Sequence, residues 1–353
     1  MTSKMDHTGF RQALLNWYRQ NKRDLPFRRT TDPYKIWLSE IMLQQTTVKT
    51  VADYYLRFIK KFPTVACVAS AGEQELLTCW QGLGYYSRIR NFKKACEILV
   101  RDGRAEVPQC YDELIRLSGV GDYTAAAVAS ICFAEARAVV DGNVKRVISR
   151  VYKYNRDITT GAAKKFFFTK ANELLDINHP GGFNQAMMEL GAVICQPHKA
   201  LCSDCPVQSY CRLAGNNPEA LPKKIKQDYV QRHYAVFVLQ DAAGLLLKKP
   251  NSRNLIKNMW ELPCHLDARH RSRNGLIKDV FGRADGLKKI KKIGTVRHSI
   301  TNKKITADIF VASLSGSPLT KDQMSGFKVV ARQGLHQIPI NTLSRKVLDR
   351  LQI

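Results

Sequence analysis

The chain of 353 residues is 44% hydrophobic and 24% charged, which excludes a disordered protein and leaves room for two hydrophobic cores. No stretch approaches the roughly 18 consecutive apolar residues of a membrane span, and the first residues carry no secretory signal. We therefore expect two domains and a cytoplasmic location.

Positive charge dominates the composition. The 56 Lys and Arg residues outnumber 30 acidic residues, which gives a formal charge of +26. Such a charge opposes compaction by self-repulsion unless an anionic partner relieves it. Nucleic acid is the leading candidate, and an anionic membrane or a ribosomal surface is the alternative that charge alone does not exclude.

The first 214 residues predict a helical domain. Apolar residues recur at helical spacing from Thr8 to Ala214, and turn-forming residues predict the breaks between helices. These predicted breaks are Pro26, Pro63, Pro108, Gly119–Gly121, Asp141–Gly142 and Pro180–Gly182. Turn formers followed by a basic run then predict a linker at residues 215–231.

Residues 232–353 predict an α+β domain. Short segments rich in β-branched or aromatic residues, separated by turn signals, indicate strands. They are Tyr234–Leu239, Leu245–Leu247, Ile290–Val296 and Ile305–Leu314. Helical spacing marks Asn274–Phe281 and Thr342–Leu351. The predicted fold class is thus multidomain, an all-α domain followed by an α+β domain.

Four of the ten cysteines fall in one short segment, residues 195–211. Between Cys195, Cys202, Cys205 and Cys211 lie six, two and five residues. In a reducing compartment such a run indicates a metal centre rather than disulfides. One compact run with a single Cys-x-x-Cys favours a [4Fe–4S] cluster. Structural zinc is the alternative, although its ligands usually divide into two knuckles.

A glycine turn, Leu117–Gly121, lies between two helical stretches. Gly119 and Gly121 permit a tight turn and expose N–H groups that, with the N-terminus of the next helix, bind a phosphate. We expect a DNA grip that is independent of base sequence. An ordinary helical corner is the alternative, because Gly-x-Gly alone is a weak signal.

Two carboxylates occupy contrasting predicted environments. Asp141 directly precedes a helix, whose N–H groups and dipole favour the ionised form; simple capping is the alternative. Glu40 lies on a largely apolar helix face, where desolvation raises the pKa and suits a general acid; a side chain that reaches water is the alternative. Glycosidic bond cleavage uses such a pair, one group to protonate the leaving group and one to stabilise the sugar cation.

Several segments together resemble the adenine-DNA glycosylases of the MutY family, which are helix–hairpin–helix enzymes with an iron–sulfur cluster. The resemblance covers about Thr8 to Leu213. It rests on the order and spacing of Leu25–Arg28, Ser39–Thr46, Gly82–Tyr86, the hairpin, Val140–Val144, Phe183–Met188 and the cysteine run. It implies a monomeric bacterial, nucleoid-associated repair enzyme that removes adenine mispaired with 8-oxoguanine or guanine in double-stranded DNA.

The resemblance also implies roles for individual residues. Glu40 protonates adenine at N7, and Asp141 stabilises the oxocarbenium ion or briefly bonds to it. Tyr123 and Asn143 orient this pair. The pocket for the flipped adenine is lined by Phe27, Arg28, Leu43, Val48 and Gln185. Gln45 and Tyr85 enter the base stack near the lesion, since such enzymes extrude the target base before reacting on it.

Some positions depart from the family pattern or separate it from its neighbours. Phe27 replaces the family's usual tryptophan. Since a smaller aromatic ring can still stack, we expect an altered adenine pocket rather than a lost one. An endonuclease III-like bifunctional glycosylase is the nearest alternative, but Tyr123 stands where its Schiff-base lysine belongs, which predicts a monofunctional enzyme. A non-catalytic DNA-binding iron–sulfur protein is the other alternative, and it leaves both carboxylates unexplained.

The C-terminal part resembles the Nudix-like domain that adenine glycosylases append, chiefly at Met259–Pro263. No glutamate follows Glu261, so the glutamate cluster of a working Nudix hydrolase is missing. The family reads 8-oxoguanine with a Phe-Ser-His segment; here His298 and Ser299 are followed by Ile300, Thr301 and Asn302. A hydroxyl and an amide keep the hydrogen-bonding capacity, so we expect discrimination to depend on Thr301 and Asn302, with a plain surface turn as the alternative.

Overall fold

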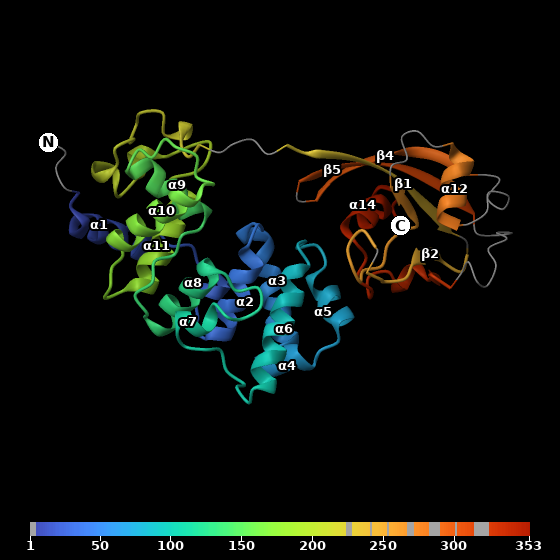
Figure 1. Ribbon diagram of the computed structural model, residues 1–353, viewed down its shortest axis with the longest axis horizontal. Coiled ribbons are helices and arrows are strands. Elements are labelled where there is room, and N and C mark those ends of the chain that lie inside the picture. The colour runs from blue at the N-terminus through green and yellow to red at the C-terminus, as the bar shows by residue number, and fades with distance from the viewer. Residues whose placement is uncertain are drawn as a thin grey trace. The chain divides into compact units, whose positions relative to one another are not determined.

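The computed structural model describes residues 5–223, 228–240, 242–252, 254–266, 272–281, 290–300, 302–313 and 325–353. Contact density divides the chain into two compact units, Met1–Ser70 with Arg90–Lys226, and Ala71–Ile89 with Gln227–Ile353. The first unit is helical and the second is built on a sheet (Figure 1). Of the helices in these ranges, none has the length and hydropathy to span a membrane.

The helices of residues 5–223 are short and follow one another closely. Their bounds are α1 (His7–Asn21), η1 (Pro26–Arg28), α2 (Pro33–Leu43), α3 (Val48–Lys61), α4 (Val65–Ser70), α5 (Glu73–Trp80), α6 (Ser87–Arg101), α7 (Tyr111–Leu114), α8 (Asp122–Phe133), α9 (Gly142–Val151), α10 (Gly161–Leu174), α11 (Pro180–Val193), η2 (Cys202–Asp204), η3 (Gln208–Tyr210) and η4 (Pro218–Ala220). Side-chain caps fix several starts: Asp32 accepts hydrogen bonds from the N–H groups of Tyr34 and Lys35 at α2, and Thr160 caps α10.

The predicted break at Pro180–Gly182 is wrong, because α11 begins at Pro180. Proline is well tolerated at the first helical position, where no N–H bond is lost. Gly181 serves a close approach rather than a turn, since a Cβ there would lie 2.6 Å from the carbonyl oxygen of Ser130.

Buried apolar side chains hold the helical unit together. Helices α1, α9, α10 and α11 contribute to one core, which includes Phe10, Leu14, Val147, Ile148, Phe167, Phe183 and Leu190. Helix α2 is buried along most of its length, and Trp37 packs edge-on to Phe92 with ring centroids 4.5 Å apart. This packing fixes the position of the α2 side chains, Glu40 among them.

The described residues of the second unit form a six-stranded sheet with the order β4-β5-β1-β2-β6, in which β3 also pairs with β1. The elements are β1 (Val230–Gln240), β2 (Leu245–Lys248), β3 (Cys264–Leu266), α12 (Arg273–Phe281), β4 (Lys291–Ile300), β5 (Lys303–Ser313), β6 (Phe327–Val330), η6 (Arg332–Gly334) and α14 (Thr342–Arg350). Strands β1 and β5 are parallel, and the other paired strands are antiparallel. The predicted combination of an all-α part and an α+β part is confirmed.

Helices cover both faces of this sheet. Val236 and Val238 of β1 share a core with α14, while Ala235, Phe237 and Leu239 share another with α12. A strand buried on both faces has a continuous apolar sequence rather than an alternating one. Strands β3 and β6 were not predicted, because their three and four residues are too short to show a period.

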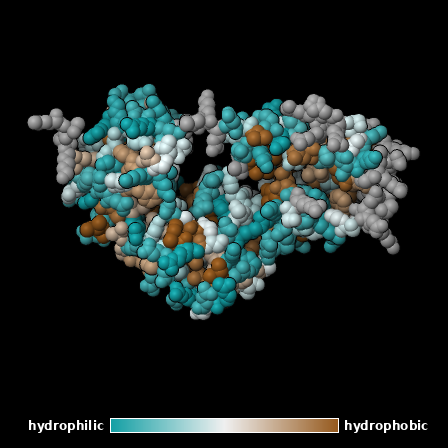
Figure 2. Space-filling model, in the orientation of Figure 1, coloured by the Kyte–Doolittle hydropathy of each residue, from teal (hydrophilic) through white to brown (hydrophobic). Residues whose placement is uncertain are grey.

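Most of the visible surface is hydrophilic, with hydrophobic residues gathered in separate areas (Figure 2). Exposed apolar residues are normal on the surface of a folded protein. The surface therefore offers polar and charged groups over most of this face.

Candidate active site

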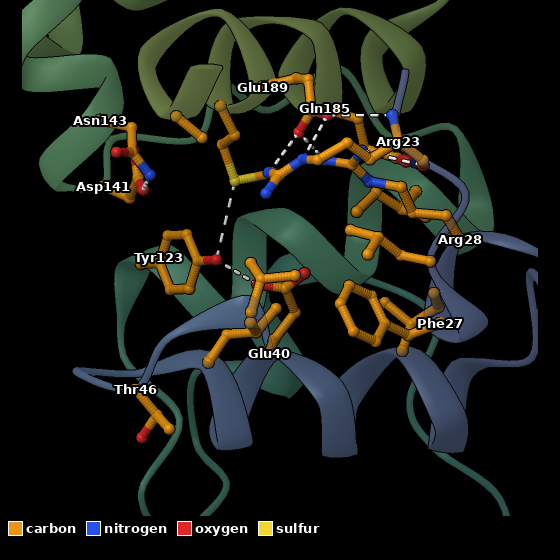
Figure 3. A pocket seen from close by; sticks show the side chains of 17 residues that line it. Arg23, Phe27, Arg28, Glu40, Thr46, Tyr123, Asp141, Asn143, Gln185 and Glu189 are labelled. Atoms are coloured by element: carbon orange, nitrogen blue, oxygen red, sulfur yellow. Dashed lines mark hydrogen bonds and ion pairs between the residues drawn. The ribbon is translucent and has the colours of Figure 1, made fainter. Parts of the chain in front are cut away.

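One pocket in the helical unit collects side chains from five segments of the chain, residues 23–28, 36–48, 123–131, 141–143 and 185–192 (Figure 3). It is lined by Arg23, Leu25, Phe27, Arg28, Ile36, Glu40, Leu43, Thr46, Val48, Tyr123, Ile131, Asp141, Asn143, Gln185, Met188, Glu189 and Ala192. All the residues predicted to act on adenine or to line its pocket are in this set. Residues as far apart in sequence as Arg23 and Glu189, 166 positions, thus meet around one cavity.

Glu40 is buried, with 6% of its surface exposed. Burial raises the pKa of this carboxyl to about 7, with a further rise from Asp141, while a hydrogen bond from Tyr123 and the charge of Arg28 act in the opposite direction. The Tyr123 hydroxyl donates a hydrogen bond to Glu40 Oε2. Burial also holds the pKa of Tyr123 well above its usual range, so the phenol remains a donor. The prediction of a desolvated carboxyl on α2 is confirmed.

Asp141 is the N-cap of α9. Its Oδ1 accepts a hydrogen bond from the Val144 N–H at 2.7 Å, and its Oδ2 accepts one from Asn143 Nδ2 at 2.8 Å. Burial nevertheless raises the pKa of Asp141, against these hydrogen bonds and the charge of Arg146. The helix terminus therefore limits the cost of burying the carboxylate rather than producing an unusually acidic group.

A groove leads from this pocket to the glycine hairpin. It is lined by Leu43, Gln44, Gln45, Gly121, Tyr123, Thr124, Asp141 and Gly142. Gly119 has φ +78°, and a Cβ there would lie 2.5 Å from Asn91 Cβ, so glycine is required. Gly121 is the N-cap of α8. The groove thus places Gly121 of the hairpin beside Tyr123 and Asp141, which also line the first pocket.

Gln45 and Tyr85, both expected to enter the base stack, have left-handed backbone conformations with φ of 58° and 46°. Such conformations cost about 1 to 3 kcal/mol in non-glycine residues and persist where the surroundings enforce them. Gln45 is exposed, and 44% of the Tyr85 surface is exposed. Both side chains are therefore accessible to a ligand.

Sequence reasoning missed the polar wall of the pocket, which is formed by Arg23 and Glu189. Glu189 lies four residues after Gln185 on α11, so helical spacing places the two side chains on one face. That signal was present in the sequence. Arg23 lies between α1 and η1, where no periodicity marks it.

The four cysteines of residues 195–211 line a second, small pocket together with Arg150, Ile194 and Leu201. Arg150 is almost fully buried, and its Nη1 donates to Cys195 Sγ at 3.2 Å and to the Gln196 carbonyl at 2.8 Å. A soft, four-thiol donor set with a buried cation beside it suits a metal–sulfur group. Among the described residues, no three His, Cys, Asp or Glu side chains are arranged to hold a single ion.

Arg146 joins the two pockets. Its Nε donates to the Cys195 carbonyl at 2.7 Å, and its Nη2 donates to Asn143 Oδ1 at 2.8 Å. Asn143 in turn donates to Asp141. A chain of hydrogen bonds therefore connects the cysteine loop with the carboxylate that caps α9.

The segment expected to read 8-oxoguanine lies at the end of β4 and the start of the turn to β5. Ile300 is half-buried and packs against the sheet core, whereas Ser299 and Asn302 are exposed. Burial and the charge of Lys346 lower the pKa of His298 to about 4, which leaves the imidazole neutral at pH 7. Thr301 lies outside the described residues.

Comparison with known proteins places this geometry in a class. Residues 38–172 match the HhH-GPD superfamily of base excision DNA repair proteins. The helical part is also similar to a solved thermostable thymine-DNA glycosylase, at 29% identity and a TM-score of 0.54 over 58% of this chain and 95% of that one. A non-covalent endonuclease III–DNA complex shares the fold, at 22% identity and a TM-score of 0.50, over 62% and 97% of the two chains.

Curated relatives narrow the class. The adenine DNA glycosylase of Rattus norvegicus is 32% identical over 97% of this chain and 78% of its own length. That of Buchnera aphidicola (subsp. Baizongia pistaciae) is 33% identical over 83% of each chain. The chain therefore belongs to the adenine DNA glycosylases, the base-excision enzymes that remove adenine from DNA.

Proposed function

We propose that this glycosylase hydrolyses the N-glycosidic bond of adenine paired with 8-oxoguanine or guanine, with Glu40 as the general acid and Asp141 as the stabiliser of the sugar cation. Glu40 gives its proton to N7 of the flipped adenine, and the C1′–N9 bond breaks with its electrons going to the base. Asp141 offsets the positive charge at C1′ by its own charge or by a brief covalent bond. Water then adds at C1′ and releases a proton.

The observation that carries this proposal is the unequal pair of carboxyl groups in one pocket. Glu40 has its pKa raised to about 7 by burial, which makes it half protonated near neutral pH and well matched to proton donation. Asp141 accepts two hydrogen bonds at the start of α9, which favour its anion. Tyr123 supports Glu40 and Asn143 supports Asp141.

Substrate access uses the groove beside the pocket. The hairpin at Gly119 and Gly121 binds a DNA phosphate, Gln45 and Tyr85 enter the stack, and the extruded adenine occupies the pocket lined by Phe27 and Leu43. The +26 charge supports DNA as the partner, and affinity should fall steeply with salt as counterions are released. Tyr123 has no amine for a Schiff base, so the enzyme is monofunctional. Little borohydride-trapped adduct is the expected outcome.

Recognition of the opposite base falls to the C-terminal part in this proposal. Residues 1–214 form the glycosylase domain, residues 215–231 the linker, and residues 232–353 a Nudix-like domain that contacts 8-oxoguanine through Thr301 and Asn302. The exposed position of Asn302 at the turn supports contact with DNA. The protein acts as a monomer on chromosomal DNA, which in a bacterium is the cytoplasmic nucleoid.

The cysteine pocket holds a [4Fe–4S] cluster in this proposal, with Cys195, Cys202, Cys205 and Cys211 as ligands. The bound group has a mainly structural role, ordering the loop that exposes His198 and Lys199. Iron and sulfide in anaerobically purified protein are the expected result. Zinc without iron would refute the assignment.

The decisive experiment measures adenine release under single-turnover conditions. Duplexes carrying adenine opposite 8-oxoguanine, guanine or thymine are compared for the parent protein and for Glu40→Gln. We expect excision opposite 8-oxoguanine and guanine only, and a loss of about 10³-fold in the variant with DNA binding retained. Near-parental rates in Glu40→Gln would refute the acid assignment.

A further inference from the structure

Glu189 forms a buried ion-pair cluster at the wall of the adenine pocket, and the reaction proposed above does not use it. Its side chain is 0% exposed. Its Oε1 accepts hydrogen bonds from the backbone N–H of Arg23 at 3.0 Å and from Arg23 Nε at 2.8 Å. Its Oε2 accepts from Arg23 Nη2 at 2.7 Å and from Arg28 Nη2 at 2.6 Å. One carboxylate thus binds two guanidinium groups.

Arg28 faces both glutamates of the pocket. Figure 3 shows its side chain between the wall formed by Glu189 and the α2 side chains around Glu40. Arg28 also lies over the Tyr18 ring, and the Tyr18 hydroxyl donates to Gln185 Oε1. The same cation pairs with Glu189 and acts electrostatically on Glu40.

The two glutamates have opposite protonation behaviour. Burial raises the pKa of Glu189, but hydrogen bonds from Arg23 and Arg28 outweigh burial and bring it to about 2. For Glu40, burial prevails and the pKa rises to about 7. The titratable groups that act on Glu40 come from three elements: Tyr123 of α8, Asp141 at the start of α9, and Arg28 of η1. The charge of Glu40 also contributes to the raised pKa of Cys132 on α8, after burial and Asp32.

We propose that Glu189 is a positioning residue that offsets the charge of Arg28 and Arg23 and thereby keeps Glu40 in its protonated, proton-donating form. Asp141 has its own cation in Arg146, so Glu189 is the anion that offsets Arg23 and Arg28, and Glu40 is left neutral. Without Glu189 the pocket gains one positive charge. An uncompensated cation nearby favours a carboxylate over a carboxylic acid, so Glu40 would lose its proton at a lower pH.

This inference rests on the role proposed for Glu40, and the pH dependence of single-turnover excision tests it. A general acid is active below its pKa, so the rate falls as the pH rises through that value. In Glu189→Gln we expect the midpoint of this fall to move down by about one pH unit. At alkaline pH the variant then loses about tenfold more activity, relative to its own low-pH plateau, than the parent protein.

Three further variants make the test specific. Glu189→Asp keeps the charge and should keep the midpoint near the parental value. Arg23→Gln leaves Glu189 to neutralise Arg28 alone and should move the midpoint upward, which also tests the idea if Glu189→Gln fails to fold. Glu173→Gln removes the same charge from α10, where Glu173 pairs with Lys170 away from the pocket, and should leave the profile unchanged.

The outcomes separate the two proposals. A Glu189→Gln rate reduced by one factor at every pH, with an unmoved midpoint, would mean that Glu189 only packs the wall, and the inference would be wrong. An active Glu40→Gln would instead overturn the acid assignment itself. Inactive Glu40→Gln together with a displaced midpoint in Glu189→Gln supports both.

Discussion

The adenine pocket and the end of the β4–β5 hairpin differ in how firmly their polar groups are held. In the pocket, Glu40 and Asp141 each have a partner fixed by helix packing. At the turn between β4 and β5, Ser299 and Asn302 are exposed, and Ile300 packs against the core. In the proposed mechanism, the catalytic groups are therefore preorganised, whereas the reader of the opposite base acquires its contacts from the bound DNA. Substitutions should therefore cost more in the pocket.

The largest effect, similar to that of Glu40→Gln, is expected for Asp141→Asn. This change keeps the size of the side chain but removes the charge that stabilises the sugar cation. Loss of one preorganised electrostatic group costs about 10² to 10³-fold in rate, with DNA binding preserved by the hairpin and the basic surface. Single-turnover excision and a binding titration measure the two properties. A rate within tenfold of the parent would place the stabilising charge elsewhere.

Tyr123→Phe should change the pH dependence as well as the rate. Burial raises the pKa of Glu40 and the hydrogen bond from Tyr123 lowers it. In the variant, Glu40 should therefore keep its proton to higher pH. The parental excision rate should fall above about pH 7. In Tyr123→Phe the midpoint of this fall should move to higher pH, whereas in Glu189→Gln it should move to lower pH. A downward displacement would contradict the hydrogen-bond argument. The excision rate at pH 6 provides the reference.

A smaller effect is expected at the turn between β4 and β5. Thr301→Ala with Asn302→Ala removes two hydrogen-bonding groups, each worth about 1 kcal/mol, and should reduce the preference for 8-oxoguanine over guanine by about 30-fold. Excision opposite guanine should change little. Asn172→Ala, which removes an exposed amide from α10, is the matched control. An unchanged preference in the double variant would assign recognition to Gln45 and Tyr85 instead.

The smallest effect is expected for Phe27→Trp, the change toward the residue usual in the family. Phe27 is buried and packs edge-on to Tyr55, with ring centroids 5.7 Å apart. A larger ring must displace this contact, and overpacking costs about 1 to 3 kcal/mol of stability. We expect excision within about fivefold of the parent and a lower melting temperature. A gain in both would indicate that the pocket is underfilled.

Local sequence rules determined much of this protein. The cap at Asp141 and the left-handed turn at Gly119 follow from residue chemistry within a few positions. The spacing of the four cysteines is also a local signal. The apolar face around Glu40 predicted its desolvation, and the change from helical to β-type patterning predicted the two kinds of fold. These signals are readable because each depends on neighbours along the chain.

Tertiary structure decided what distant segments do to one another. The bond from Tyr123 to Glu40 spans 83 positions and the pair of Arg23 with Glu189 spans 166, and no local pattern encodes either. The parallel pairing of β1 with β5, the short strands β3 and β6, and the start of α11 at Pro180 likewise depend on packing partners. Propensity and periodicity act over a few residues, whereas the charge balance of a buried pocket is set by every group that folding brings into it.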